Sequence, residues 1–496
     1  MDREKRGVRI SSEDDVAVAL ETCVAGDLLR AGGVSVPVRE DVPAGHKVAL
    51  HQIRRGDPVR KYGFPIGNAS AEIPAGAWVH VHNLKTGLDG ILEYRYRPDF
   101  RPLPQATAPT FPGYLRKNGA VGVRNEIWIL PTVGCVNSIA RNLERLAAPM
   151  APGRVDGVFA FCHPHGCSQV GEDLLRTQKI LAGLARHPNA GGVLILGLGC
   201  ECNNIAAFQA VLGEWDPERV KFLNCQDAPD ETEAGLVLLR ALIETASGDV
   251  RVPVSADRLI VGLKCGGSDG FSGITANPVV GEFSDRLCAA GGAAILTEVP
   301  EMFGAETILM DRCETPAAFQ KTVDLINSFK RYFARYGQTI YENPSPGNKA
   351  GGLTTLEDKS LGCTQKGGTA PVRGVADYGD AVKTAGLNLL SAPGNDLVAA
   401  SACAAAGAQI VLFTTGRGTP FGCPVPTVKI STNPDLASRK PGWIDFDASP
   451  VLTGTPVPDL GAALFDEVLR VAGGGETKNE RNGCRDLAIF KDGVTE

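Results

Sequence analysis

Short apolar runs separated by turn residues fill the beginning of the chain. In the stretch KVALHQIRRGDPVRKYGFPIGNASAEIPAGAWVHVHN, the triplets Arg-Gly-Asp and Pro-Ala-Gly and the pair Gly-Asn separate the apolar runs. Runs this short between Gly- and Pro-containing turns are typical of β-strands. The pattern predicts a small, mostly β domain over residues 12–90. Residues 91–117 show no regular apolar period, because proline, arginine and polar residues interrupt it, and we expect a linker there.

The pattern changes to alternating strands and helices from residue 118. EIWILPTVGC, DGVFAFCHPHGC, AGGVLILGLGCE and RVKFLNCQ are apolar strand candidates, and helix-compatible segments follow them. A second series repeats the pattern further along: RLIVGLKCGGSDG, GGAAILTEVPEM, GLNLLSAPGND and AQIVLFTTGRGTP. We therefore predict two α/β domains, over residues 118–250 and 251–496. The strand ends then lie at the carboxyl edges of parallel sheets, where such sheets usually bind ligands.

Composition and charge argue against several classes of protein. Hydrophobic residues make up 43% of the 496 positions and charged residues 21%, and the formal net charge is −6. These values are typical of a folded soluble protein and do not indicate binding to nucleic acid or to a membrane surface. The N-terminus, MDREKRGVRISSEDD, lacks the apolar core of a signal peptide. We therefore expect a cytoplasmic protein with mostly reduced cysteines.

Gly-rich turns carry polar residues at many of the predicted strand ends. Examples are TVGCVNS, HPHGCSQ, GLGCECNN, KCGGSDGFSGITANP, NPSPGNKAGG, SAPGND and TTGRGTPFG. Glycine lets a ligand approach the main chain, and such turns form anion-binding nests, so a polyhydroxy anion suits this lining. Sharp turns that need a positive φ explain the same glycines equally well. No Walker loop or dinucleotide fingerprint is present, and we expect no nucleotide cofactor.

Four cysteines lie at predicted strand ends: Cys135, Cys167, Cys200 and Cys265. They are candidates for soft-metal ligands or for simple packing. His163 lies close to Cys167 in sequence, which leaves nucleophilic cysteine catalysis open. The chain has no CxxC pair, so a structural zinc site is not indicated.

Two cations emerge from Gly-rich turns rather than from amphipathic helices. These are Lys349, in NPSPGNKAGG, and Arg417, in TTGRGTPFG. An arginine can bind a carboxylate through two parallel hydrogen bonds. The alternative for each is an ordinary surface cation, and the tight glycine flanks of Arg417 favour a binding role there.

The segment WVHVHN places two of the seven histidines one residue apart. If this segment is a β-strand, His80 and His82 point to the same face with Cα atoms roughly 6.5 Å apart. Two imidazoles at that separation can share one metal ion. Alternatively, the two rings only cover the surface of a half-exposed strand.

These motifs together make the sequence recognisable. GHKVALHQI, WVHVHN, VGVRNEIWILPTVGCVNSIAR, CGGSDGFSGITANP, LTEVPEMFGAE, YENPSPGNKAGGLTTLEDKSLGCTQK and TTGRGTPFG resemble the D-altronate dehydratase family, within the wider group that includes galactarate dehydratase. The resemblance covers nearly the whole chain. It implies an N-terminal SAF domain (β-clip) joined to α/β domains. It also implies a hydro-lyase that forms 2-dehydro-3-deoxy-D-gluconate from D-altronate, with Fe²⁺ or Mn²⁺ as activator.

The chemistry of that reaction suggests roles for the candidate residues. Removal of the C2 proton next to a carboxylate needs a metal or fixed cations to neutralise the developing charge. Lys349 and His163 are the candidates for the base that takes this proton. The candidate metal ligands are His80, His82, Cys135, Cys167 and Cys200. The candidates for binding the sugar-acid substrate are Asp269, Asn277, Ser345, Asn348 and Arg417.

Some positions depart from the family pattern, and other functions stay open. Cys162, His165 and Cys202 are additional to the pattern, and we assign them no role. Galactarate dehydratase and sulfolactate sulfo-lyase are alternatives within the group, because polar turns do not report substrate length or stereochemistry. A non-catalytic sugar-acid-binding protein is the alternative of another class. A homo-oligomer is compatible with the sequence.

Overall fold

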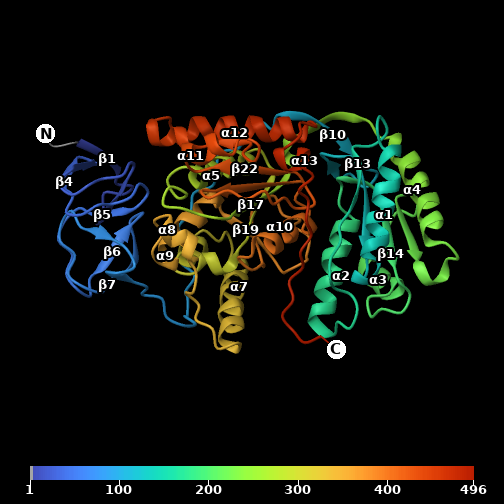
Figure 1. Cartoon of the computed structure of the whole chain (residues 1–496), viewed down its shortest axis with the longest axis horizontal. Helices are drawn as coiled ribbons and strands as arrows, with labels where there is room; N and C mark the ends of the chain where they lie inside the picture. Colours follow the sequence, from blue (N-terminus) through green and yellow to red (C-terminus); the bar gives the residue numbers. More distant parts are fainter. Residues whose placement is uncertain (1–3, 496) are drawn as a thin grey trace.

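A computed structural model describes residues 4–495 of the chain. Figure 1 shows three units along the longest axis of the molecule. A β unit formed by the beginning of the chain lies at one end, the largest α/β unit lies in the middle, and a smaller α/β unit lies at the other end. This order differs from the order in sequence, because the smaller α/β unit precedes the larger one along the chain. The predicted class, a small β domain followed by α/β domains, is confirmed.

The N-terminal β unit contains a six-stranded sheet in the order β4-β3-β1-β2-β5-β8 and a three-stranded sheet in the order β6-β7-β9. Exposed and buried residues alternate in β6, as expected for a strand with one face on a core. The apolar residues of both sheets form two small cores. The strands are β1 (Glu4–Val8), β2 (Val16–Ala19), β3 (Leu28–Ala31), β4 (Val34–Pro37), β5 (Lys47–Ala49), β6 (Pro58–Lys61), β7 (Phe64–Ala69), β8 (Trp78–Val79) and β9 (Leu84–Lys85).

A small antiparallel sheet stands where the chain enters and leaves the smaller α/β unit. Its order is β11-β10-β16, and β10 pairs with β16 over five residues. The predicted linker therefore contains a strand, β10, whose partner lies about 140 residues further along. The Pro-Gly pair in TFPGYL interrupts the apolar pattern, so this strand was not predicted. The strands are β10 (Thr110–Leu115), β11 (Val121–Gly122) and β16 (Arg251–Ser255).

The smaller α/β unit has a four-stranded parallel sheet in the order β13-β12-β14-β15. All six residues of β12 are buried, because helices cover both faces of the sheet. This explains why its strands are continuous apolar runs in the sequence. The elements are β12 (Glu126–Pro131), α1 (Asn137–Ala147), β13 (Gly157–Ala160), α2 (Gly171–Ala185), β14 (Ala190–Gly197), α3 (Ile205–Leu212), β15 (Val220–Asn224) and α4 (Glu231–Ser247).

The larger α/β unit has a seven-stranded parallel sheet in the order β19-β20-β18-β17-β21-β22-β23. Alternate residues of its central strands enter two different cores: Leu412 packs with α5 and α12 on one face, and Phe413 packs with α10 on the other. The strands are β17 (Ile260–Cys265), β18 (Ala293–Leu296), β19 (Val372–Ala376), β20 (Gly386–Leu390), β21 (Ile410–Thr415), β22 (Thr427–Ser431) and β23 (Phe446–Asp447). The helices are α5 (Ala276–Ala289), α6 (Glu306–Asp311), α7 (Pro316–Arg335), α8 (Pro346–Ala350), α9 (Leu356–Cys363), α10 (Asp396–Ala405), α11 (Pro434–Arg439), α12 (Val457–Ala472) and α13 (Lys478–Arg481).

The two α/β units are joined by a common core and by the end of the chain. Helices α2 and α10 contribute to the same apolar cluster. The C-terminal segment then returns to the smaller unit, where Arg485 pairs with Glu126 at 2.8 Å and Asp173 accepts the backbone N–H of Asp492 at 3.0 Å. Within residues 4–495, no helix has both the length and the apolar character needed to cross a bilayer.

Candidate functional site

Four neighbouring strands of the seven-stranded sheet end in polar loops at one edge. β20, β18, β17 and β21 are adjacent in that order. Their carboxyl ends lead into loops that begin at Ser391, Thr297, Gly266 and Gly416. All four strands are parallel, so these loops meet at a single edge, where α/β sheets usually bind ligands.

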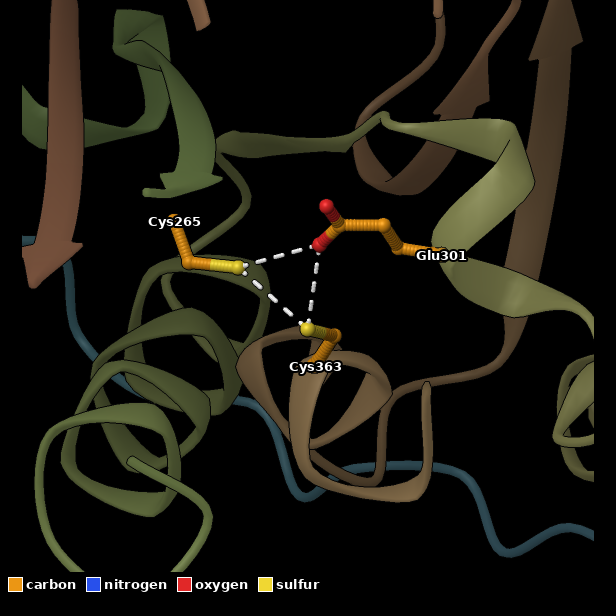
Figure 2. Close-up of side chains that lie close together, drawn as sticks. All are labelled: Cys265, Glu301 and Cys363. Carbon is orange, nitrogen blue, oxygen red and sulfur yellow. Dashed lines mark hydrogen bonds between the residues drawn. The ribbon is translucent and has the colours of Figure 1, made fainter. Parts of the chain in front are cut away.

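Cys265, Glu301 and Cys363 meet beneath this edge, as Figure 2 shows. Cys265 is the last residue of β17, Glu301 lies in the 3₁₀ turn after β18, and Cys363 is the last residue of α9. The two Sγ atoms are 3.3 Å apart, and Glu301 Oε2 lies 3.5 Å from Cys265 Sγ and 3.2 Å from Cys363 Sγ. All three side chains are buried. Within the described residues, they form the one group of three potential metal ligands whose donor atoms lie within 4.8 Å of one another.

Two buried lysines contact this cluster directly. Lys366 Nζ donates a hydrogen bond to Cys265 Sγ at 2.9 Å and also lies 3.3 Å from Glu298 Oε2. Lys359 Nζ donates to Glu301 Oε1 at 2.7 Å. Both ammonium groups therefore lie within hydrogen-bonding distance of potential metal ligands.

A third lysine, Lys264, extends the network toward the rim of the site. Its Nζ pairs with Glu298 and lies 2.8 Å from Asp396 Oδ1, and the Asp396 side chain is 34% exposed. Glu298 has a left-handed backbone with φ of 68°, which is unusual for a residue other than glycine and is common at functional sites. A Cβ on Gly266 would lie 2.5 Å from both Asp396 and Phe413, so glycine is required next to Cys265.

The network sets the charge states of its members. Burial raises the pKa of Glu301, but Lys359, Lys264 and Lys366 outweigh this effect and lower the pKa to about 2. Glu301 is therefore a carboxylate and a weak base. The hydrogen bond between the Cys363 thiol and Cys265, together with burial, raises the pKa of Cys363 well above its usual value.

The donor set of the cluster fits a divalent metal ion. The three lysines and the three carboxylates Glu298, Glu301 and Asp396 cancel in formal charge. If both thiols are deprotonated, as metal ligands must be, the network carries two negative charges, which one divalent cation balances. Two thiolates with one carboxylate suit iron or zinc better than magnesium or calcium.

The N-terminal β unit docks against helix α9, which carries Cys363. Asp358 accepts Lys47 Nζ at 2.7 Å and Lys61 Nζ at 3.0 Å, and all three side chains are buried. Lys47 also donates to the carbonyl of Gly352 at 2.7 Å. Burial lowers the pKa of Lys47 to about 8, even though Asp358 raises it. Burial alone would raise the pKa of Asp358, but the two ammonium groups lower it far below its usual range.

The strand predicted for WVHVHN ends before the histidine pair. β8 ends at Val79, and His80 and His82 lie in a turn that is closed by the N–H of Asn83 bonding to the carbonyl of His80 at 3.0 Å. The side chain of Asn83 accepts the N–H of His80 at 2.9 Å and so competes with continued strand pairing. The two histidines therefore do not share one face of a strand.

The aromatic residues of this turn pack against the larger α/β unit. The rings of Trp78 and His80 are stacked with centroids 5.2 Å apart, and His80 Nδ1 lies 3.2 Å from Thr354 Oγ1. Both nitrogens of His46 have partners, the Trp78 indole N–H at 3.2 Å and the carbonyl of Ala350 at 3.3 Å. Burial lowers the pKa of His80 to about 4, so its imidazole is neutral at pH 7. His82 is exposed.

Two of the predicted substrate-binding residues are buried and make hydrogen bonds within the protein. Asp269 accepts hydrogen bonds from Thr432 Oγ1 at 3.0 Å and Asn433 Nδ2 at 2.9 Å. The amide of Asn277 donates to a backbone carbonyl at 3.0 Å and accepts a threonine hydroxyl at 2.7 Å. These contacts position the loop after β17 and the start of α5 instead of leaving groups free for a ligand.

The other predicted substrate-binding residues lie on neighbouring loops of the same edge. Ser345 caps α8 in a reciprocal pair with Asn348, whose Oδ1 also lies 3.4 Å from Lys359 Nζ. Arg417 is exposed, and its backbone N–H bonds to the carbonyl of Gly267 at 3.0 Å, directly beside the loop of Cys265. Within residues 4–495 the guanidinium of Arg417 has no hydrogen-bond partner.

The two predicted bases lie in different surroundings. Lys349 is half-buried on α8, next to Asn348, and its Nζ makes no hydrogen bond within the described part of the chain. His163 is in the smaller α/β unit, where its Nε2 lies 2.7 Å from the carbonyl of Pro131 and its Nδ1 accepts the N–H of His165 at 3.2 Å. Burial lowers the pKa of His163 to about 4. With both nitrogens engaged, His163 has the surroundings of a structural residue.

The predicted metal ligands do not come together within one chain. Cys135, Cys167 and Cys200 lie on the smaller α/β unit, whereas His80 and His82 lie on the N-terminal β unit. Figure 1 places these units at opposite ends of the molecule, with the larger α/β unit between them. Within a single chain, the histidines therefore cannot share an ion with one of these cysteines, contrary to the expectation from the sequence.

Sequence reasoning missed most of the buried cluster. Cys265 was noted at a strand end, but Glu301, Lys359, Cys363 and Lys366 were not singled out. The segments LTEVPEMFGAE and TLEDKSLGCTQK contain them and were part of the resemblance. The usable signal was a charged turn directly after an apolar strand, as in ILTEVPE, because a strand end of a parallel sheet faces the ligand edge.

Comparison with known proteins identifies the family. A model described as the altronate/galactarate dehydratase SAF domain matches residues 5–87. The second domain of D-galactarate dehydratase/altronate hydrolase matches residues 113–247, and the C-terminal domain of D-galactarate/altronate dehydratase matches residues 256–495.

Relatives match along the full length of the chain. The altronate dehydratase of Escherichia coli K12 is 55% identical over 491 residues, which are 98% of this chain and 99% of the relative. That of Bacillus subtilis 168 is 53% identical and covers 99% of this chain and 100% of its own. The galactarate dehydratase (L-threo-forming) of Escherichia coli K12 is 30% identical, with 97% of this chain and 96% of its own covered. The chain therefore belongs to the altronate/galactarate dehydratase family.

Proposed function

We propose that this protein is a hydro-lyase that dehydrates D-altronate to 2-dehydro-3-deoxy-D-gluconate and water. The observation that carries the proposal is the identity of 55% and 53% to two altronate dehydratases over essentially the whole chain. The identity to galactarate dehydratase is 30%. This difference favours altronate as the substrate.

The reaction breaks two bonds and places demands on the site. A base takes the C2 proton, the C3–O bond breaks, and the leaving hydroxyl receives a proton and departs as water. The enol then becomes the 2-keto acid. Negative charge develops on the carboxylate as the C2 proton leaves, so fixed positive charge near that carboxylate lowers the barrier.

Arg417 and a bound divalent ion would supply such positive charge at the edge of the seven-stranded sheet. Lys264, Lys359 and Lys366 neutralise the buried carboxylates beside that ion and are held in place by them. Arg417, on the neighbouring loop, is free to bind the substrate carboxylate through two hydrogen bonds. A divalent ion held by Cys265, Glu301 and Cys363 would supply a Lewis acid for the substrate oxygens, and the thiolate donors favour Fe²⁺ over Mn²⁺.

Lys349 is the group we propose as the base for the C2 proton. It follows Asn348, which contacts both Lys359 and the loop of Cys265. The residue is half-buried, and no carboxylate of the described chain pairs with its amine. His163 has no free ring nitrogen, and it lies on the other α/β unit. Lys349 is therefore the better of the two candidates.

The test combines a panel of substrates with an isotope experiment. Anaerobically purified protein should convert D-altronate to a 2-keto acid much faster than galactarate or sulfolactate. Chelator should abolish turnover, and Fe²⁺ or Mn²⁺ should restore it. Faster turnover of galactarate, or release of sulfite from sulfolactate, would replace the proposed substrate. Tight binding of altronate without product would instead indicate a binding protein.

The role of Lys349 is tested with Lys349→Met and with Lys321→Met, an exposed lysine of α7, as the matched control. Lys349→Met should lower kcat by at least about 100-fold, the usual contribution of a positioned base. The C2 hydrogen of altronate should also stop exchanging with solvent deuterium. Retained exchange in Lys349→Met would remove Lys349 from the reaction.

A further inference from the structure

The four exposed cysteines of residues 4–495 lie at one edge of one sheet. They are Cys135, Cys167, Cys200 and Cys202, and they follow the strands β12, β13 and β14. Cysteine is among the most often buried residue types, and the other ten cysteines are buried or half-buried. These strands are neighbours in the order β13-β12-β14, so their carboxyl ends stand roughly 4.8 Å apart. The three loops that carry these thiols therefore start side by side.

The three loops are bonded to one another. The N–H of Gly134, next to Cys135, bonds to the carbonyl of His165 at 2.8 Å. The carbonyl of Gly166, next to Cys167, accepts the N–H of Asn203 at 3.2 Å. A Cβ on Gly166 would lie 2.0 Å from a backbone oxygen of the first loop, so only glycine permits this approach. Each cysteine is therefore within a few residues of a contact that fixes its loop against the next.

The third loop is held by a buried carboxylate. Glu201, next to Cys200, accepts the hydroxyl of Thr132 at 2.6 Å and the N–H groups of Leu198 at 3.0 Å and Gly199 at 2.6 Å. The carboxylate of Glu201 therefore serves to hold this loop in position. The cysteine beside it is consequently presented on a fixed backbone rather than on a flexible one.

A second observation also points to a ligand at this edge. Several buried side-chain atoms close to the cysteines have no hydrogen-bond partner: Asn137 Oδ1, Gln169 Nε2, Asn203 Oδ1 and Asn224 Oδ1. Buried polar groups are nearly always satisfied, so a group of exceptions at one edge indicates a missing partner. Gln169 Nε2 is a donor, and the sulfur of a cluster could accept its hydrogen bond. The three asparagine oxygens are acceptors, and water or a hydroxyl group bound at this edge would satisfy them.

We propose that Cys135, Cys167 and Cys200 hold an iron–sulfur cluster of the [4Fe–4S] type. The three sulfur atoms do not all lie within 4.8 Å of one another. At least one pair of thiols is therefore too widely separated to chelate a single ion. Wider separation suits a cluster, because each cysteine binds a different iron. The chain contributes three thiolates after loss of their protons, and iron and sulfide are supplied from outside. The fourth iron then has a position for water or an oxygen ligand. This site does not rest on the proposed dehydration.

The first experiment measures iron and acid-labile sulfide in protein purified under argon. Wild type and the control Cys484→Ser should hold about four sulfides per chain and about four irons (about five when the buried site also binds Fe²⁺), and should show sulfide-to-iron charge-transfer absorption. Cys135→Ser, Cys167→Ser and Cys200→Ser should each lose most of the sulfide and the absorption, with circular dichroism unchanged. Cys265→Ser should retain the sulfide, which separates this site from the buried cluster near Glu301.

A second experiment needs no variant, so misfolding cannot obscure it. In anaerobic wild-type protein, mass spectrometry should find Cys135, Cys167 and Cys200 protected from iodoacetamide, and Cys202 modified. Oxidative destruction of the cluster with ferricyanide and chelator should expose all three. Iron without sulfide, zinc in place of iron, or three thiols that react at once in the protein as isolated would overturn the proposal. Loss of altronate turnover alone would not affect it.

Discussion

Replacement of Asp358 by asparagine tests how the N-terminal β unit is held on the larger unit. Asp358 neutralises Lys47 and Lys61, and all three side chains are at most 1% exposed. Asparagine keeps the shape but leaves two buried ammonium groups without a counter-charge. Breaking a buried pair in this way costs about 3–5 kcal/mol. Because 1.4 kcal/mol is a factor of ten, amides of β5, β6 and α9 should exchange with deuterium on the order of 10² to 4 × 10³ times faster.

The loss should depend on pH in a defined direction. Lys47 has a pKa of about 8 in the fold and about 10.4 when unfolded, so the folded state binds fewer protons between these values. Stability of the native protein should therefore rise with pH across that window. Without Asp358 the pKa of Lys47 falls further, and the rise in Asp358→Asn should begin below pH 8.

Hydrogen exchange followed by mass spectrometry from pH 6 to 9 measures both effects. Asp435→Asn is the matched control, because Asp435 pairs with Arg439 on an exposed helix turn and should change stability by no more than about 0.5 kcal/mol. Exchange within threefold of wild type in Asp358→Asn, at every pH, would show that the carboxylate does not hold the two units together.

Three further changes test the site and its surroundings. Cys363→Ser should remove bound metal from the buried cluster and lower kcat by at least about 100-fold, whereas normal metal content by elemental analysis would exclude Cys363 as a ligand. Arg417→Ala should lower kcat/KM for altronate about 10- to 100-fold, the equivalent of a lost charged hydrogen bond. An unchanged kcat/KM would show that Arg417 does not bind the substrate. The pKa of His80 is about 4 in the folded protein and about 6.5 in the unfolded chain, so the stability of the fold decreases as the pH drops from 6.5 to 4. In His80→Gln, the melting temperature should decrease less over this pH range. An equal decrease in the variant and in wild type would contradict this prediction.

The parts of the fold that the sequence predicted well are those with strong local patterns. Strands β12 and β17 are buried on both faces and therefore form continuous apolar runs. Strand β10 was missed, because TFPGYL is interrupted by proline and glycine and is stabilised by pairing with distant β16. The alternation expected for WVHVHN failed at Val79, where the side chain of Asn83 closes a turn.

The candidate site was harder to predict, because its partners are distant in sequence. Helix α9, LEDKSLGC, has the charges of a surface helix, yet all eight of its residues are buried. Asp358 is neutralised by Lys47 and Lys61 of the N-terminal unit, and Lys359 is neutralised by Glu301. Nothing local in α9 indicates these partners. Cys265 could be placed at a strand end, but its neighbour Cys363 is 98 residues away.

The return of the C-terminal segment has a consequence for biosynthesis. The sheet of the smaller α/β unit is complete once residue 224 has left the ribosome. The partner of its buried Glu126 is Arg485, which is translated 359 residues later. Until then a carboxylate lies in the nascent unit without its guanidinium, and Asp173 lacks the backbone amides that it later accepts. This unit should therefore stay loosely ordered through most of translation. A premature stop codon near the 3′ end of the message would damage a region synthesised long before it.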